Sequence, residues 1–316
     1  MLRLRVRSIT YEAEGILSFD LVDPEGRDLP VFDAGAHVDV QIPGGLTRRY
    51  SLCDSPRMRD HYRIGVLNDP KSRGGSRAMH ERVRPGDLID VSGPHNFFPL
   101  APDTRHALLL AGGIGITPLM AMIEHMRETG QSYELHYCTR TPEVTPFTKR
   151  LTPEVAAGRA HLHHDGGDPR KGLDITGLLR SPSQGTHVYY CGPTGFMKAV
   201  QEATDHWASD SVHFEYFGVD PTVLSTAVDA RTGEVVLERS GRTIQVQPSQ
   251  TILQAVRDAG IPCESSCESG LCGTCKVRYT GGHPQHNDFV LSEEERQEFV
   301  LICCAGIAEG PLVLDI

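Results

Sequence analysis

The sequence predicts three domains in series: a small antiparallel β-barrel, an α/β domain built on a parallel sheet, and a cysteine-rich C-terminal domain. The chain has 316 residues, which exceeds the size of most single hydrophobic cores, so two or three domains are expected. Its hydrophobic pattern changes from short alternating runs to alternating strands and helices near residue 102. Most of its nine cysteines lie after residue 260.

Net charge and cysteine usage exclude several classes of function. With 31 basic and 41 acidic residues the formal charge is −10, which argues against nucleic acid or an anionic membrane as the main partner. The first residues alternate like a strand, and no apolar stretch approaches the roughly 20 residues of a membrane span. We therefore expect a cytoplasmic protein, in which clustered cysteines indicate metal binding and not disulfides.

Residues 1–101 have the pattern of a small antiparallel barrel. Short runs such as HVDVQI and DLIDVSG alternate or are β-branched, and turns rich in Gly, Pro and Asp separate them. Little helical periodicity interrupts these runs, so strands are predicted throughout this region.

Residues 102–221 have the pattern of a doubly wound domain. Strand-like ALLLAGG, ELHYCTR, AHLHHDGG, HVYYCGP and VHFEYFG alternate with helical stretches such as PLMAMIEHMRE and GFMKAVQEATDHW. Strands that alternate with helices predict a parallel sheet with helices on its faces.

Residues 222–316 are predicted to begin with a linker, which runs from about Asp220 to Thr232, and to continue as a third domain. The linker has no clear period and is punctuated by Thr, Asp and Pro. The expected elements of the third domain are a hairpin around Ser240 and Gly241, a short helix closed by Gly260, and a helix whose Ser292 and Glu295 form a capping box.

The C-terminal region carries the most specific motif of the chain. CESGLCGTC places Cys267, Cys272 and Cys275 at the CxxxxCxxC spacing of plant-type iron-sulfur proteins. Four thiolates must converge on two bridged irons, and glycines in the loop let backbone amides approach the sulfurs. A structural zinc site is the alternative, but zinc ribbons prefer paired CxxC knuckles.

Cys303 and Cys304 are the candidates for the fourth ligand. Neighbouring residues in a strand face opposite ways, so only one of the two can face the cluster, and we choose Cys303. Cys263 precedes the ligand loop and is interpreted as a bystander. The predicted metal ligands are Cys267, Cys272, Cys275 and Cys303.

A glycine-rich turn follows the first strand of the α/β domain. In LLLAGGIGITPLM an apolar strand leads into Gly112, Gly113 and Gly115, with Thr117 as the expected N-cap and Pro118 at the first helical position. Exposed amides and the helix dipole at such a turn favour a pyrophosphate. The spacing is not GxGxxG, and any doubly wound domain needs glycine at a tight strand-to-helix turn, so the motif does not identify a ligand by itself.

A second strand end in the same domain supports the interpretation of the glycine turn as a pyrophosphate-binding site. YYCGPTGFM places Cys191, Gly192 and Pro193 between a strand and a helix. Both strand ends would open on the carboxyl edge of the sheet, where such folds bind ligands. Cys191 is either a small buried residue at a strand end or a thiol beside a bound nicotinamide.

The barrel region contains RRYSLC and, some 20 residues later, KSRGGSRAMH. Arg48, Tyr50 and Ser51 can present a cation and an aromatic plane to a flavin ring and its phosphate. The amides around Gly74 and Gly75 could hold that phosphate at a helical turn. Taken without the neighbouring domains, both stretches are better explained as a surface strand and a glycine-rich loop.

These motifs, in this order, resemble one family over almost the whole chain: the phthalate dioxygenase reductases, including the reductase components of vanillate-type O-demethylases. The resemblance rests on RRYSL, SRGGS, AGGIGITP, YCGP, HFEYFG and CESGLCGTC with Cys303. It implies an antiparallel flavin-binding β-barrel (1–101), an α/β nucleotide-binding domain with a parallel sheet (102–221), and a linker with a β-grasp plant-type ferredoxin domain (222–316). It also implies FMN rather than FAD, NADH rather than NADPH, and a 2Fe-2S cluster.

The resemblance implies roles for individual residues. The implied catalytic residues are Ser51, Cys191 and Glu215, with Glu215 and Phe217 near the flavin and the hydride path. The implied flavin-binding residues are Arg48, Arg49, Tyr50, Ser51, Val66, Leu67, Gly74, Gly75, Ser76 and Phe217. The implied nucleotide-binding residues are Gly112, Gly113, Ile114, Gly115, Thr117, Pro118, Thr139, Arg140, Cys191, Gly192 and Pro193.

Two positions depart from the family pattern. Thr141 stands where an acidic residue would help to select NADH, although Glu143 lies close and Arg140 could attract a 2′-phosphate. Ser72 begins the phosphate loop where the family often has glycine.

Electron counting favours a relay. NADH delivers two electrons as a hydride, a 2Fe-2S cluster accepts one, and a flavin can hold zero, one or two. No general acid and base pair is expected. His161, His163 and His164 share one strand-like run, but strand alternation favours solvated or packed histidines over a further metal site.

The leading hypothesis is an NADH-dependent reductase that passes single electrons to a terminal Rieske-type aromatic oxygenase or O-demethylase. A haem-thiolate monooxygenase as the partner, and a 2Fe-2S redox sensor, are the alternatives. No nucleic-acid or membrane partner is expected, and the family suggests a monomer.

Overall fold

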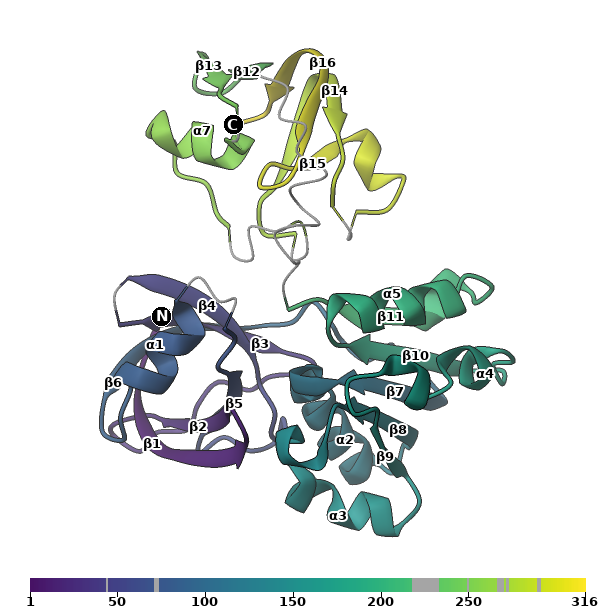
Figure 1. Ribbon diagram of the computed structural model, residues 1–316. Coiled ribbons are helices and arrows are strands. Elements are labelled where there is room, and N and C mark those ends of the chain that lie inside the picture. The colour runs from purple at the N-terminus through teal and green to yellow at the C-terminus, as the bar shows by residue number, and fades with distance from the viewer. Residues whose placement is uncertain are drawn as a thin grey trace. The chain divides into compact units, whose positions relative to one another are not determined.

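The computed structural model contains two compact units, Met1–Glu215 and Tyr216–Ile316 (Figure 1). The predicted linker lies almost entirely outside the described residues, and Cys267 and Cys272 lie outside them as well. The described residues are 1–43, 45–70, 74–217, 233–248, 250–265, 270, 273–288 and 291–316.

An antiparallel barrel forms the first part of the N-terminal unit. Its strand order is β4-β3-β6-β1-β2-β5, and just beyond β4 Leu52 bridges Ile64 of β5, which brings the two outer strands together. Side chains alternate inward, as Val38 and Val40 do in β3, and this confirms the predicted barrel. The elements are β1 (Leu2–Ala13), β2 (Ile16–Val22), β3 (His37–Ile42), β4 (Leu46–Ser51), β5 (Tyr62–Leu67), α1 (Gly75–Arg82) and β6 (Leu88–His95).

A five-stranded parallel sheet forms the second part of this unit, as predicted. Its order is β11-β10-β7-β8-β9, so the chain progresses one way from β7 to β9 and returns to the other side of β7 with β10. Helices α2 and α3 lie on one face and α4 and α5 on the other (Figure 1). The strands are β7 (His106–Gly112), β8 (Ser132–Thr139), β9 (Ala160–His164), β10 (Thr186–Cys191) and β11 (Val212–Glu215). The helices are η1 (Gly113–Gly115), α2 (Ile116–Thr129), η2 (Pro142–Val144), α3 (Thr148–Ala156), η3 (Pro169–Lys171), α4 (Ile175–Leu179), α5 (Thr194–Ala203) and η4 (Ser209–Ser211).

The start of α2 differs from the prediction. The 3₁₀ turn η1 runs directly into α2, whose N-cap is Gly115, so Thr117 is already inside the helix. Its hydroxyl donates to the carbonyl of Ile114 at 3.0 Å and does not cap the helix. Pro118 consequently occupies the third helical position and not the first.

Several polar contacts join the barrel to the parallel sheet. The Arg150 guanidinium of α3 donates to the Cys53 carbonyl and to Asp54 Oδ1, both at 2.9 Å, and to Glu124 of α2 at 3.0 Å. The Ser55 hydroxyl donates to Glu128 at 2.6 Å. Because Asp54, Arg150 and Glu124 are all largely buried, this junction is an inter-domain network rather than an exposed surface ion pair.

A mixed sheet of order β13-β12-β16-β14-β15 forms the C-terminal unit, with β12 and β16 parallel. The hairpin around Ser240 and Gly241 and the helix closed by Gly260 are confirmed. A Thr251–Gln254 capping box, which the sequence pattern did not reveal, begins that helix. The elements are β12 (Gly233–Leu237), β13 (Arg242–Val246), α7 (Ile252–Asp258), β14 (Lys276–Gln285), η5 (Glu295–Gln297), β15 (Phe299–Leu301) and β16 (Gly306–Leu314).

Two expectations for this unit were wrong in part. Ser292 and Glu295 exchange the predicted capping-box hydrogen bonds, at 3.1 and 3.2 Å. The predicted helix, however, is only the single 3₁₀ turn η5. The second concerns Cys303 and Cys304, which lie in a turn after β15 and not in a strand. Strand alternation therefore cannot decide between these two thiols.

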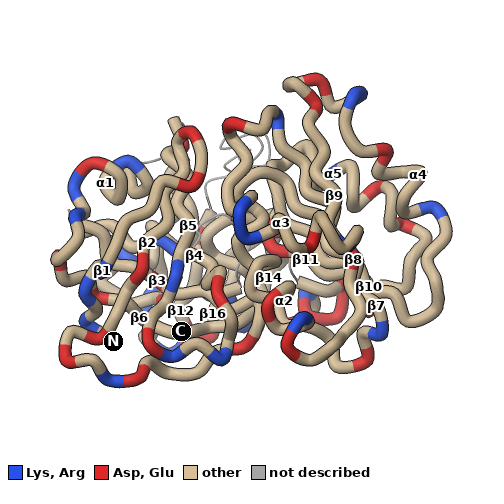
Figure 2. The backbone as a smooth tube through the Cα atoms, turned by 90° about the horizontal axis from the view of Figure 1, so that it is seen from below, with Lys and Arg blue, Asp and Glu red and all other residues tan. Residues whose placement is uncertain are grey.

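Acidic and basic positions are intermixed along the described backbone in the view of Figure 2. None of the helices in the described ranges combines the length and hydropathy that a membrane-spanning segment requires.

Gly35 packs closely against the segment that follows β6, and this close approach generates a stability prediction. A Cβ atom at Gly35 would overlap the carbonyl of Phe98, and φ is +91° there. Gly26 also has a positive φ, +77°, but faces open space. We expect Gly35→Ala to lower the free energy of unfolding by about 1–3 kcal/mol more than Gly26→Ala, because only the first adds a clash to the backbone strain. Thermal or urea unfolding of both variants measures the difference, and equal losses would contradict the close approach.

Candidate functional site

Strand β4 presents the predicted flavin residues on two faces. Arg48 and Tyr50 share one face, and Arg49 and Ser51 share the other, because side chains alternate along a strand. The structure therefore does not bring all four to one surface. It places each pair against a different set of neighbours.

The first face adjoins the N-terminus of α1. A Cβ atom at Gly75 would lie 2.7 Å from Cγ and Nε of Arg48, so this arginine packs directly against the first turn of the helix. Gly74 is the N-cap of the helix, with φ of +96°, and as a glycine it has no side chain of its own with which to cap the helix. Helix amides with a guanidinium beside them suit a phosphate monoester, so this corner fits the phosphate end of a flavin nucleotide.

Tyr50 and the end of β5 lie close to that corner. Burial raises the pKa of the Tyr50 phenol, so the ring is neutral at physiological pH. Val66 is fully buried while Leu67 is partly exposed, and the Val66 carbonyl lies 2.9 Å from Nε2 of His80 on α1. Ser76 meets the same region, since its hydroxyl accepts from the Asp69 amide at 3.3 Å.

On the second face, Ser51 reaches the end of the parallel sheet. Its hydroxyl donates to Glu215 Oε2 at 3.3 Å, across 164 residues of sequence. Burial raises the pKa of Glu215 to about 7, although the nearby Arg49 and the Ser51 hydrogen bond oppose this shift. Glu215 is consequently poised between its acid and carboxylate forms near neutral pH.

His37 completes this buried polar group and was not predicted from the sequence. Its Nδ1 lies 4.0 Å from Glu215 Oε1, and burial lowers its pKa to about 2, so the ring is neutral and forms no ion pair. Neither ring nitrogen has a hydrogen-bond partner among the described residues. Buried polar atoms are rarely left unsatisfied in folded proteins, so these two nitrogens would suit a bound group that offers donors or acceptors, as a flavin ring does. The only signal in the sequence was a histidine at the start of the alternating strand HVDVQI.

Arg49 lies beside this group. Its guanidinium sits over the Phe97 ring at 5.3 Å, and its Nε is 3.8 Å from Asp39 Oδ1. Phe97 in turn lies 5.4 Å from the His37 ring and is 58% exposed. A large aromatic ring left exposed beside this buried polar group suits a stacking surface for a planar ligand.

The two predicted strand ends of the α/β domain meet as neighbours. β7 and β10 pair in parallel, with Ala111 opposite Cys191. A Cβ atom at Gly115 would overlap the Cys191 carbonyl, and one at Gly112 would lie 2.8 Å from Pro193 Cδ. The glycines therefore permit a backbone contact between the two turns, at the point where the strand order reverses and where ligands bind in such sheets. Gly113, Ile114 and Gly192 belong to the same two turns.

Cys191 also connects this edge to Glu215. The two residues are register partners on β10 and β11. Cys191 is fully buried, and burial, with the Glu215 carboxylate adding to it, raises the pKa of its thiol well above the usual range. Cys191 is therefore a neutral wall of the site and not a thiolate nucleophile.

The end of β8 lies farther along the same edge. Thr139 is buried and contacts Thr145 Oγ1 at 2.7 Å and His164 Nδ1 at 2.9 Å, while Arg140 is exposed. The nearby Glu143 is exposed as well, and a hydrogen bond from Thr141 lowers the pKa of its carboxyl. Thr139 therefore supports the loop, and Arg140 and Glu143 are the charged groups available to a ligand there.

Phe217 belongs to the C-terminal unit and is 44% exposed.

Of the four predicted cluster ligands, Cys275 and Cys303 are described, and both are buried. The Gly270 amide donates to Cys303 Sγ at 3.3 Å, and the Cys303 thiol is also within hydrogen-bonding range of Cys275. Amide donation to a sulfur next to a second buried sulfur fits an iron-sulfur cluster.

Cys304 makes a different contact from Cys303. Its Sγ lies 3.6 Å from the Leu301 carbonyl, an acceptor to which a thiol can donate. This contact, and not strand alternation, supports Cys303 as the ligand.

Known proteins match this chain over its whole length. A family model described as "2Fe-2S iron-sulfur cluster binding domain" matches residues 235–308. The chain is 44% identical to the tert-butanol monooxygenase / tert-amyl alcohol desaturase reductase subunit of Aquincola tertiaricarbonis, covering 100% of this chain and 96% of that protein.

Solved structures give the same result. The crystal structure of phthalate dioxygenase reductase, described as a modular structure for electron transfer from pyridine nucleotides to [2Fe-2S], is 40% identical with a TM-score of 0.77, over 100% of this chain and 98% of that one. An intact type IV self-sufficient cytochrome P450 monooxygenase is 37% identical with a TM-score of 0.84, but this chain spans only 41% of it.

The barrel, the parallel sheet with its ligand edge and the 2Fe-2S domain together define an oxidoreductase of the iron-sulfur flavoprotein class, in which electrons pass from a pyridine nucleotide to a 2Fe-2S cluster. The chain belongs to the phthalate dioxygenase reductase family. The family expected from the sequence motifs is thereby confirmed.

The raised pKa of Glu215 predicts a pH-dependent stability. From about pH 4.5, the ordinary value, to about pH 7, the folded state retains a proton that the unfolded chain has released. Raising the pH through this window therefore lowers the stability of the folded state. We expect Glu215→Gln, which does not titrate, to flatten this part of the plot of unfolding midpoint against pH. Parallel curves for the variant and the wild type would show that Glu215 titrates normally.

The two adjacent thiols predict different outcomes for matched substitutions. Cys303→Ser should lose the cluster, because a hydroxyl replaces the buried sulfur that accepts the Gly270 amide and is proposed to bind iron as a thiolate. Cys304→Ser should retain it, because a hydroxyl can still donate to the Leu301 carbonyl. Iron content and visible absorbance of the purified variants measure the outcome, and a cluster lost only from Cys304→Ser would reverse the assignment.

Proposed function

We propose that this protein is an NADH-dependent FMN and 2Fe-2S reductase that supplies single electrons to a terminal oxygenase. The observation that carries the proposal is the meeting of Ser51 from the barrel with Cys191 and Glu215 from two strand ends of the parallel sheet. When bound, a flavin accepts two electrons as a hydride and releases them one at a time, as a 2Fe-2S acceptor requires.

Three features of the chain itself support this assignment. Ser51 and Glu215 offer a hydroxyl and a carboxyl that are buried together, so they can orient a polar ring edge without competing water. Cys191 supplies a neutral wall on which a nicotinamide can lie. Gly113, Ile114, Gly115 and Thr117 supply the tight turn into α2 that suits the pyrophosphate.

FMN is the proposed flavin. Arg48 and the first turn of α1 form a single phosphate-sized corner beside Tyr50 and Val66, which is where the phosphate of a mononucleotide would end. Chromatography of the flavin released by heat tests this directly, and release of FAD would contradict it.

NADH is the proposed electron donor. The exposed Glu143 carboxylate beside the end of β8 would repel a 2′-phosphate, whereas Arg140 would attract one. We expect repulsion of the 2′-phosphate by Glu143 to outweigh its attraction to Arg140. Comparison of kcat/KM for NADH and NADPH tests it, and Glu143→Gln should narrow the ratio between them.

A Rieske-type oxygenase or O-demethylase is the proposed partner, since reductases of dioxygenases and an O-demethylase are among the full-length relatives. A haem-thiolate monooxygenase is the second candidate, because the whole of this chain also matches one part of a self-sufficient cytochrome P450 monooxygenase. Reconstitution with each type of terminal component, measured as substrate-dependent NADH oxidation, separates the two.

The central test is an anaerobic absorbance titration of the purified holoprotein with NADH. We expect the flavin and cluster bands to bleach together at sub-equivalent NADH, because both groups accept electrons from the same donor. A cluster band that persists while NADH remains unoxidised would remove the reductase proposal.

Ser51 provides a matched pair of variants. Ser51→Ala should slow NADH-dependent reduction of ferricyanide about tenfold, equivalent to about 1.4 kcal/mol of barrier, because Glu215 loses its hydrogen-bond donor. Ser8 also donates to a carboxylate of the barrel, Asp20 at 2.9 Å, but lies outside the proposed site. Stopped-flow rates for Ser51→Ala and Ser8→Ala measure the contrast. Equal rates in the two variants would exclude Ser51 from the site.

A further inference from the structure

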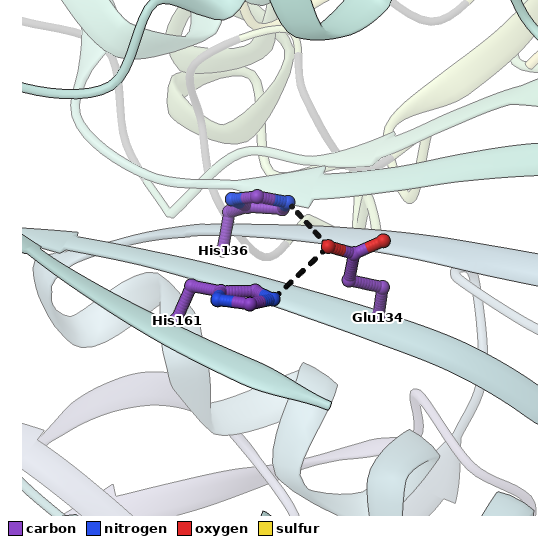
Figure 3. Close-up of side chains that lie close together, drawn as sticks. All are labelled: Glu134, His136 and His161. Atoms are coloured by element: carbon purple, nitrogen blue, oxygen red, sulfur yellow. Dashed lines mark ion pairs between the residues drawn. The ribbon is translucent and has the colours of Figure 1, made fainter. Parts of the chain in front are cut away.

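A cluster of potential metal ligands lies on strands β8 and β9. Glu134 and His136 project from the same face of β8, and His161 projects beside them from β9, where it is the register partner of His136 (Figure 3). Glu134 Oε1 is 3.2 Å from His136 Nε2 and 3.0 Å from His161 Nε2. None of these residues belongs to the proposed electron-transfer site.

The spacing of these atoms suits a transition metal. The three ligand atoms all lie within 4.8 Å of one another. Ligands bound to zinc at about 2.0–2.1 Å in a tetrahedron lie roughly 3.4 Å apart, so small side-chain shifts would place one ion among all three. Two imidazoles and one carboxylate also form one of the donor sets that zinc prefers.

The hydrogen bonding around His136 points in the same direction. His136 Nε2 is buried and has no hydrogen-bond partner among the described residues, although it faces the Glu134 carboxylate. Its other nitrogen, Nδ1, lies 3.0 Å from Nε2 of His163. Histidine ligands usually hold one nitrogen toward the metal and donate the other to an outer acceptor, which is the role that His163 fits.

We propose that Glu134, His136 and His161 bind a zinc ion, with His163 orienting His136. Glu134 and His161 are 38% and 41% exposed at their side chains, so an ion can enter from solvent and keep a water as its fourth ligand. The site lies within the strands and not at their carboxyl ends, where the nucleotide is proposed to bind. The ion would therefore fasten the edge strand β9 to β8, and it has no step in electron transfer.

The test uses the tag-free holoprotein in equilibrium dialysis against zinc chloride. Zinc and iron are then measured in the same sample, and the iron of the 2Fe-2S cluster, two atoms per chain, gives the concentration of protein chains. We expect about one zinc per two irons in the wild type. His161→Gln should lose it, because a ligand is removed at a half-exposed position where folding is not at risk. His164→Gln is the matched control and should retain the zinc, since His164 contacts Thr139 and not the proposed zinc ligands.

Zinc at vacant cluster cysteines must be distinguished from zinc at this site. X-ray absorption at the zinc edge separates them, because zinc bonds to nitrogen and oxygen at about 2.0–2.1 Å but to sulfur at about 2.3 Å. His163→Phe should weaken zinc binding by about 10- to 100-fold, the usual effect of losing an outer-shell partner. Zinc absent from the wild type, bound through sulfur, or bound equally by His161→Gln would overturn the proposal.

Discussion

The site depends on one close backbone approach, between the turn after β7 and the end of β10. Gly115 lies so near the Cys191 carbonyl that no side chain fits between them, and a Cβ at Gly112 would lie 2.8 Å from Pro193 Cδ. This contact sets the spacing of two strand ends at the reversal of strand order. The helix amides of α2, the thiol of Cys191 and the carboxyl of Glu215 on the next strand are all held in position by that spacing.

Desolvation gives this edge its chemistry. Glu215 has Ser51 as its hydroxyl partner, Cys191 as its register neighbour and a neutral His37 nearby, so the balance between its charged and uncharged forms is set by burial. A carboxyl at this position on the surface would be ionised and hydrated. The barrel therefore contributes more than a binding surface, because it covers the end of the sheet and excludes water from it.

The sequence predicted the architecture well, because strand and helix periods are local signals. The glycine turns, the strand end at Cys191 and the cysteine spacing were also local, and so was the pairing of Ser292 with Glu295. Other features depended on tertiary contacts. The helix start at Ile116 followed from the preceding 3₁₀ turn, and the turn at Cys303 and Cys304 replaced an expected strand. His37 and the grouping of His161 with Glu134 and His136 depended on strand neighbours that one sequence does not reveal.

Arg150 has a consequence for the dynamics of turnover. By joining Cys53 and Asp54 of the barrel to Glu124 of α2, it fastens the two halves of the first unit before any ligand arrives. Ser51 and Glu215 are consequently within reach of each other in the resting protein. Nucleotide binding needs no hinge closure within this unit to assemble the reacting geometry, so little of its binding free energy is consumed in reorganisation.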